Sequence, residues 1–117
     1  MKIIIEKHKD YLHFDALIGS EQVGYFRLGA DADGGHNLFE VFKEFRGQGI
    51  GRILLLSAIK AAKDYDLDFW SDSDSITPAA NRIYDALEEE GAIVGDGNWW
   101  EVTESGEETL EEELSAW

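Results

Sequence analysis

The feature of this sequence with the clearest chemical potential is a turn in which glycines alternate with other residues between two arginines. The run RGQGIGR occupies residues 46–52, after a strand-like segment and before a long apolar segment with helical spacing. Backbone N–H groups at a helix N-terminus lack intrahelical acceptors, and the helix dipole adds partial positive charge there. Glycines let a phosphate approach without meeting a Cβ. The turn therefore predicts an anion site, although a plain strand–helix connection with glycines for tight packing explains it about equally well.

Two better-known phosphate-binding motifs do not fit this turn. A dinucleotide-binding fingerprint opens a βαβ unit, whereas this turn follows a series of predicted antiparallel strands. A P-loop requires a Lys-Ser/Thr pair after its last glycine, and none follows Gly51. The anion site therefore has to be interpreted through the elements around it.

The elements that position the turn can be read from hydrophobic periodicity. Alternating and apolar runs predict strands, and the turn residues between them predict an antiparallel meander before residue 43. An apolar stripe from Ile50 to Tyr65 predicts a helix, and Thr77-Pro78 is typical of a helix start. The predicted strands cover residues 3–5, 11–18, 23–28, 37–42, 67–70, 92–94 and 99–102. With a second helix ending at Gly91, the order is β-β-β-β-α-β-α-β-β-α, an α/β fold (α+β, with a mixed sheet).

The last residues predict a separate short helix. Ser105 and Glu108 match a capping box, and Leu110, Leu114 and Trp117 then share one helix face. We expect an acidic helix over residues 105–117, docked through that face on a domain formed by residues 1–104.

Composition limits the classes of partner. The chain has 117 residues, 10 Lys and Arg against 25 Asp and Glu, and a net charge of −15. Nucleic acid and anionic membranes would be repelled, whereas a cationic small molecule or a basic protein surface would be attracted. Residues 83–117 hold 12 of the acids and no base, so the acidity is concentrated at the C-terminal end.

Metal sites and the compartment can be addressed from the same composition. The absence of cysteine excludes thiolate ligands and a cysteine nucleophile. Aspartates between residues 64 and 74 lack the EF-hand spacing, so we expect a solvated acidic rim and no metal site. No apolar run is long enough for a transmembrane helix or a secretory signal, which predicts a cytoplasmic protein.

The turn and its surroundings resemble the GNAT superfamily of N-acetyltransferases. RGQGIG at residues 46–51 is similar to that family's Arg/Gln-x-x-Gly-x-Gly/Ala signature, and residues 41–45 resemble the exit of its fourth strand. Residues 77–91 are similar to its second conserved helix, and residues 99–102 to its last strand. The resemblance covers residues 36–102 well and residues 11–35 more loosely. It implies a compact acyl-CoA N-acyltransferase fold with a splay between the fourth and fifth strands.

The same resemblance implies acetyl-coenzyme A as the co-substrate and direct attack of an amine on its thioester. Contacts to the coenzyme are then implied for Val41, Phe42, Arg46, Gly47, Gln48, Gly49, Ile50, Gly51, Arg52 and Asn81. Strand alternation would put His36, Leu38 and Glu40 on one face, which makes Glu40 a candidate general base. A solvated strand face explains these residues equally well.

Two departures from the family leave a second function open. Its members usually carry two helices between the first two strands, where this chain has only residues 6–10. The family's tyrosine acid usually lies four residues before the helix-ending glycine, where this chain has Leu87. Tyr84, one turn earlier, is the candidate acid, and a packed tyrosine is the alternative. We expect an acetyltransferase for an amine on a cationic small molecule or basic peptide. The alternative is an inactive acidic protein of the same fold that occupies a basic surface, and a homodimer stays open in either case.

Overall fold

A computed structural model describes residues 1–29, 38–70, 77–96 and 99–117 of the chain. Its elements follow the order expected from the sequence, with one added 3-10 turn. They are β1 (Lys2–Lys7), β2 (Tyr11–Ile18), β3 (Glu21–Gly29), β4 (Leu38–Val41), η1 (Lys43–Phe45), α1 (Ile50–Asp64), β5 (Phe69–Trp70), α2 (Pro78–Glu89), β6 (Ile93–Gly95), β7 (Trp99–Val102) and α3 (Glu104–Ser115). The expected α/β class is confirmed. No helix in the described part of the chain has the length and apolarity to cross a membrane.

The described strands form two sheets in which every pairing is antiparallel, so the single mixed sheet expected from the sequence is not found among them. The larger has the order β1-β2-β3-β4 and the smaller the order β5-β7-β6, so the chain splits its sheet between β4 and β5. The three residues His8–Asp10 connect β1 to β2, which leaves no room for helices at that point. In this register Gly24 lies opposite Val41, and Tyr25 lies opposite Glu40. The split leaves one edge of β4 without a paired strand among the described residues.

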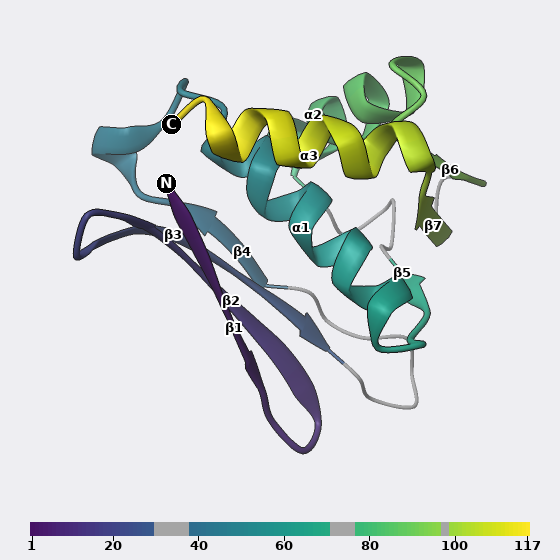
Figure 1. Cartoon of the computed structure of the whole chain (residues 1–117), viewed down its shortest axis with the longest axis horizontal. Helices are drawn as coiled ribbons and strands as arrows, with labels where there is room; N and C mark the ends of the chain where they lie inside the picture. Colours follow the sequence, from purple (N-terminus) through teal and green to yellow (C-terminus); the bar gives the residue numbers. More distant parts are fainter. Residues whose placement is uncertain (30–37, 71–76, 97–98) are drawn as a thin grey trace.

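The helices cover one face of the four-stranded sheet and leave the other face bare (Figure 1). Alternation along β2 buries Leu12, Phe14 and Ala16 beneath α1, as period-two strands require. α1 is buried on most sides, because the first sheet, the second sheet and α3 all pack around it. Its position fixes the turn at residues 46–49 against the end of β4.

The start of α2 agrees with the sequence interpretation. The Thr77 hydroxyl accepts a hydrogen bond from the backbone N–H of Ala80 at 3.2 Å, and Pro78 is the first helical residue. Gly91, just beyond the helix, has φ +78°, which suits a residue without a Cβ. α2 therefore begins beside the glycine turn and ends at the connection to β6.

The C-terminal helix differs in two details from the sequence prediction. Thr103, rather than Ser105, caps α3, because the Thr103 hydroxyl accepts from the Gly106 N–H and itself donates to the Gly91 carbonyl. This places the first helical residue at Glu104. Leu110 is buried and Leu114 packs on the core, but Trp117 lies beyond the helix end and is 43% exposed. The prediction that Trp117 helps to dock the helix is therefore wrong.

Candidate functional site

A cleft of about 560 Å³ opens where β4, the glycine turn and the N-termini of α1 and α2 meet. Its volume falls within the range of small-molecule sites. Of the residues singled out from the sequence, those that line it are Glu40, Val41, Arg46, Gly47, Gly49, Ile50, Gly51 and Arg52. All eight lie within residues 40–52, and residues 77–83 at the start of α2 complete the lining from a distant part of the sequence.

The backbone of the turn suits an anion. Gly47 and Gly49 both have φ +82°, a left-handed conformation that favours glycine, and a Cβ built on either would meet no atom within 4 Å. The first intrahelical bond of α1 runs from the Ile53 N–H to the Gly49 carbonyl. The N–H groups of Ile50, Gly51 and Arg52 consequently lack intrahelical acceptors and lie at the positive end of the helix dipole.

Gly51 has a different role from the two glycines before it. A Cβ at this position would lie 3.1 Å from both Ile83 Cδ1 and Phe39 Cζ, and 3.5 Å from Val41 Cγ2. The missing side chain lets α1 pack closely against β4 and α2. Gly51 therefore sets the width of the apolar part of the cleft, while Gly47 and Gly49 shape its polar end.

Arg46 lies exposed at the mouth of the cleft. Its Nε donates a hydrogen bond to the Val41 carbonyl at 2.9 Å. The sequence resemblance implies that Val41 and Arg46 both contact the coenzyme. The carbonyl oxygen has a second lone pair, so a ligand N–H can bond to it beside Arg46 Nε or displace the guanidinium, which would then be available to an anion.

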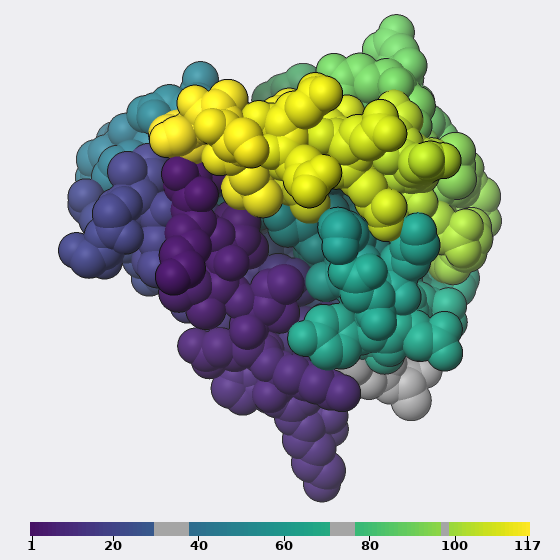
Figure 2. Space-filling view, viewed as in Figure 1, coloured from purple at the N-terminus to yellow at the C-terminus, as the bar shows by residue number. Residues whose placement is uncertain are grey.

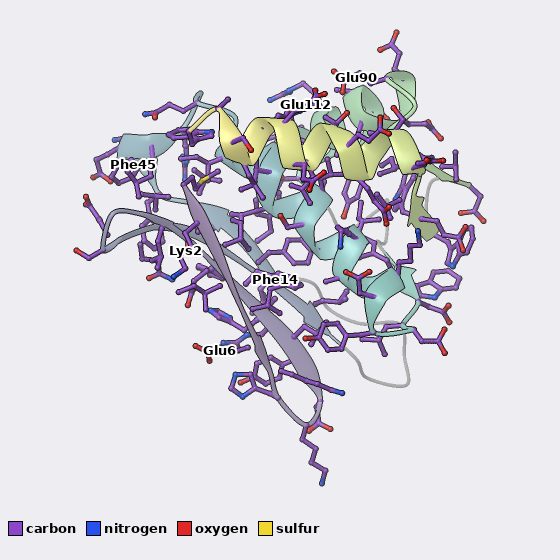
Figure 3. The ribbon with its side chains drawn as sticks, in the orientation of Figure 1. Lys2, Glu6, Phe14, Phe45, Glu90 and Glu112 are labelled. Atoms are coloured by element: carbon purple, nitrogen blue, oxygen red, sulfur yellow. The ribbon has the colours of Figure 1, made fainter. Side chains whose placement is uncertain are left out.

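The guanidinium of Arg52 is already paired with two carboxylates. Arg52 Nη1 lies 2.6 Å from Glu90 Oε2, at the end of α2, and Arg52 Nε donates to Glu113 Oε1 of α3, also at 2.6 Å. Burial lowers the pKa of Arg52, but the hydrogen bonds to Glu113 and Glu90 outweigh burial and raise it above its usual value. Figure 3 shows Glu90 at the end of α2. The Arg52 side chain thus holds three helices together, and only its backbone N–H is suited to the anion site.

Glu40 lies on the bare face of the sheet at the border of the cleft. β4 alternates, so Phe39 and Val41 face the helices while Glu40 faces away from them and is exposed. Tyr25 lies opposite Glu40 on β3, and the Tyr25 ring contacts Phe42 edge-on with centroids 6.5 Å apart. His36, which was expected on the same face as Glu40, lies outside the described residues.

The candidate acid Tyr84 lies in the core and does not line the cleft. It is 3% exposed, and its ring stacks on Trp100 with centroids 5.4 Å apart. Leu87, one turn later on the same helix face, is also fully buried. The position of Tyr84 therefore favours the alternative of a packed tyrosine, because the face of α2 that carries residues 84 and 87 packs on the second sheet.

Three other predicted contacts are also missing from the described lining of the cleft. Phe42 follows β4 and donates its N–H to the Val23 carbonyl, Gln48 is exposed in the turn, and Asn81 is half-buried on α2. The sequence interpretation missed six lining residues, namely Phe39, Phe45, Thr77, Ala79, Ala80 and Ile83. Ala79, Ala80 and Ile83 lie at helical spacing in the sequence, which indicates an apolar helix face but not that this face borders the cleft.

The described aspartates between residues 64 and 74 lie around β5, away from the cleft. Asp66 and Asp68 border a smaller hollow of about 250 Å³, while Asp72 and Asp74 lie outside the described residues. Asp64 forms an ion pair with Lys60 at 2.6 Å.

Comparison with known proteins supports the family resemblance. The chain matches the family model described as "Acetyltransferase (GNAT) family" over residues 2–87, which is about three quarters of its length. Searches of the curated proteins and of the solved structures gave no significant match.

Proposed function

The chain belongs to the GNAT family of acetyltransferases, and from this premise we propose that it transfers the acetyl group of acetyl-coenzyme A to an amine. The observation that carries the proposal is the cleft itself. It joins the unpaired N–H groups of α1, suited to a pyrophosphate, to apolar walls and to the unpaired edge of β4.

Each part of the cleft has a separate task in this proposal. The N–H groups of residues 50–52, with the Arg46 guanidinium, bind the pyrophosphate. Phe39, Val41 and Ile83 provide the apolar wall along the pantetheine arm. The coenzyme supplies a thioester carbonyl. Glu40 takes a proton from the amine so that its nitrogen lone pair can attack that carbonyl, and the thiolate then leaves.

The acceptor in this proposal is an amine on a cationic small molecule or a basic peptide. A chain of net charge −15 raises the local concentration of cations around it. Glu40 and Asp15 both lie on the bare sheet face, one strand apart from Tyr25 on either side. This face provides carboxylates and aromatic rings where an amine would approach β4.

Titration calorimetry with acetyl-coenzyme A tests the donor site through a single substitution. Gly49→Glu places a side chain and a negative charge at a position of φ +82° beside the predicted pyrophosphate site. We expect Gly49→Glu to abolish detectable binding of acetyl-coenzyme A. The new carboxylate would repel the phosphates at a position where the wild-type chain offers backbone N–H donors.

Gly19→Glu is the matched control for this experiment. Gly19, between β2 and β3, also has a positive φ of +64°, and a Cβ there meets no atom within 4 Å. Both variants therefore introduce the same charge and comparable strain, but only one lies at the cleft. Wild-type protein that shows no binding at about 1 mM ligand would contradict the donor site.

A second candidate function is the capture of a basic protein surface without catalysis. It is favoured by α3, where Glu108, Glu111 and Glu112 form no ion pair with any described residue. Figure 3 shows Glu112 on this helix. Replacement of these three residues by Gln should weaken capture of a basic partner and leave acetylation unchanged if both activities exist. If the wild-type protein acetylates an amine and Glu40→Gln does not, the result favours the acetyltransferase over the binding protein.

A further inference from the structure

The first strand of the chain is apolar, and one of its edges pairs with no strand in the described part of the chain. β1 pairs with β2 on one side, and no described strand pairs with its other side. Its six residues include three consecutive isoleucines, and Ile5 is 42% exposed. Figure 2 shows β1 at the surface, beside α3 and α1. Exposed edges of this kind present N–H and C=O groups to any further strand.

The two faces of β1 carry different side chains. Ile3 and Ile5 border a groove of about 460 Å³ together with Leu110 and Leu114 of α3. Lys2, Ile4 and Glu6 alternate with them on the bare face, and Figure 3 shows Lys2 and Glu6 along the strand. Lys2 and Glu6 therefore stand at equal distances on either side of Ile4, with opposite charges.

We propose that two copies of this chain associate by antiparallel pairing of β1 with β1 about a two-fold axis at Ile4. In this register Lys2 lies opposite the partner's Glu6, and by symmetry Glu6 lies opposite the partner's Lys2. Ile3 lies opposite the partner's Ile5 on the groove side. Opposite charges and β-branched pairs in directly opposite positions both stabilise antiparallel strands. The resulting interface is self-complementary, as a two-fold interface requires.

Other registers lack this match. Residues directly opposite each other in an antiparallel pair have side chains on the same face of the sheet. In two copies of one strand, an odd-numbered residue must therefore lie opposite an odd-numbered one, so the neighbouring registers are centred on Ile3 or on Ile5. The first places Lys2 opposite the partner's Ile4. The second places Lys2 opposite the partner's His8 and Ile3 opposite the partner's Lys7. Only the register centred on Ile4 pairs charge with charge and isoleucine with isoleucine.

The distribution of charge favours this edge over other surfaces for self-association. Residues 1–9 contain three lysines and one glutamate, whereas residues 83–117 contain no base. β1 and its turn thus carry more bases than acids, although the neighbouring groove is also lined by Asp64, Glu107 and Glu111.

The proposed pairing extends the sheet without obstructing the donor cleft. β1 and β4 lie at opposite edges of the four-stranded sheet, so the two sheets would join at β1 and leave each β4 unchanged. The interface can therefore be tested without any activity measurement, and its failure would say nothing about acetyl transfer.

Charge reversal tests the register by sedimentation at fixed ionic strength. Lys2→Glu alone and Glu6→Lys alone each place like charges opposite each other twice per dimer, so each should weaken dimerisation by about tenfold or more. A mixture of the two single variants, and the double variant, should restore it because each arrangement re-creates opposite charges. Lys9→Glu, an equal charge change in the β1–β2 connection, should have little effect.

Cross-linking tests the axis directly, because the chain has no cysteine of its own. Ile4→Cys places one thiol per chain at the axis, where opposite Cα atoms lie about 4.5–5.5 Å apart and a disulfide can form. Oxidation should give a covalent dimer from Ile4→Cys but not from Lys9→Cys. Wild-type protein that is monomeric at about 1 mM overturns the proposal. A dimer that neither reversal weakens, or that gives no Ile4→Cys cross-link, overturns it as well.

Discussion

At the scale of single residues, Glu40 and the apolar wall of the cleft lie on opposite faces of β4. Phe39 and Val41 face the helices, where the donor is proposed to bind, and Glu40 faces the bare side of the sheet. No described strand pairs with the edge of β4 that faces away from β3, so a thioester bound in the cleft could be reached across that edge. The amine would therefore approach from the bare face while the coenzyme enters from the helix side.

Glu40→Gln tests this geometry. We expect acetyl transfer to fall by roughly 10²–10⁴-fold, because an amide cannot accept the proton that the amine must lose. Calorimetric binding of acetyl-coenzyme A should be unchanged, because the side chain points away from the donor wall. Glu44→Gln, in the exposed η1 turn, is the matched control. Turnover that survives Glu40→Gln in full would assign the base elsewhere.

Tyr84 illustrates a residue whose type suggested chemistry and whose position indicates packing. Its ring stacks on Trp100 and lies 6.4 Å from the ring of Phe69. Tyr84→Phe should leave kcat within about twofold, since the cleft is untouched. Tyr84→Ala should lower the free energy of unfolding by about 3–5 kcal/mol, as for other large buried aromatic residues. Chemical denaturation and initial rates measure the two effects, and a large loss of kcat in Tyr84→Phe alone would restore its role as an acid.

At the scale of elements, α3 stabilises the site without lining it. Its first turn is fixed by Thr103 and by Gly106, where a Cβ would lie only 2.1 Å from the Ala92 carbonyl. Its last turns are fixed by the ion pair of Glu113 with Arg52, at the N-terminus of α1. The buried Oε2 of Glu113 has no hydrogen-bond partner among the described residues, so this carboxylate depends on Arg52.

Arg52→Ala should therefore destabilise the protein by about 1–3 kcal/mol, because it leaves Glu113 partly buried without its cation. The side chain of Arg52 is 23% exposed, so the cost should fall below that of a fully buried pair. Since the pKa of Arg52 is raised, its contribution is fully present below the ordinary arginine pKa and is lost only as pH rises through the raised value. Thermal melts should thus show the same loss of stability at pH 7 and pH 9.

Arg82→Ala, on the exposed side of α2, is the control for this prediction. If Arg52→Ala destabilises the protein no more than Arg82→Ala does, the contact of Arg52 with Glu90 and Glu113 contributes nothing to stability.

At the scale of the whole molecule, the net charge should act in opposite directions on the two proposed substrates. A chain of charge −15 would attract the proposed cationic acceptor but repel the anionic coenzyme, which would have to be bound by local donors. In the proposal these donors are backbone N–H groups and Arg46, because Arg52 is already paired with two glutamates.

Ionic strength should therefore affect the two substrates differently. Between about 0.01 M and 0.1 M salt the screening length falls from about 30 Å to about 10 Å. Across this range the KM of a polyamine acceptor should rise by about tenfold. The KM of an amine that carries no charge besides its reacting group should change little. Steady-state kinetics with both acceptors measures the difference. Equal salt responses would show that the acidic surface does not select the acceptor.

Local patterns in the sequence determined most of the elements of this protein and its proposed anion site. Alternation predicted the meander, the apolar stripe predicted α1, and Thr77-Pro78 marked the start of α2. The glycine turn was predictable because φ angles and unpaired N–H groups at a helix start depend on a few adjacent residues.

Only the tertiary structure decided which side chains are available at the cleft. Arg52 stood in the motif as a candidate anion contact, but it pairs with Glu90 and with Glu113, 61 residues away. Helical spacing predicts that Tyr84 and Leu87 share one helix face. The structure shows that this face is buried, because the Tyr84 ring packs against Trp100 and Phe69. Spacing fixes the direction of a side chain on its own element, whereas its partner depends on which distant element packs against that face.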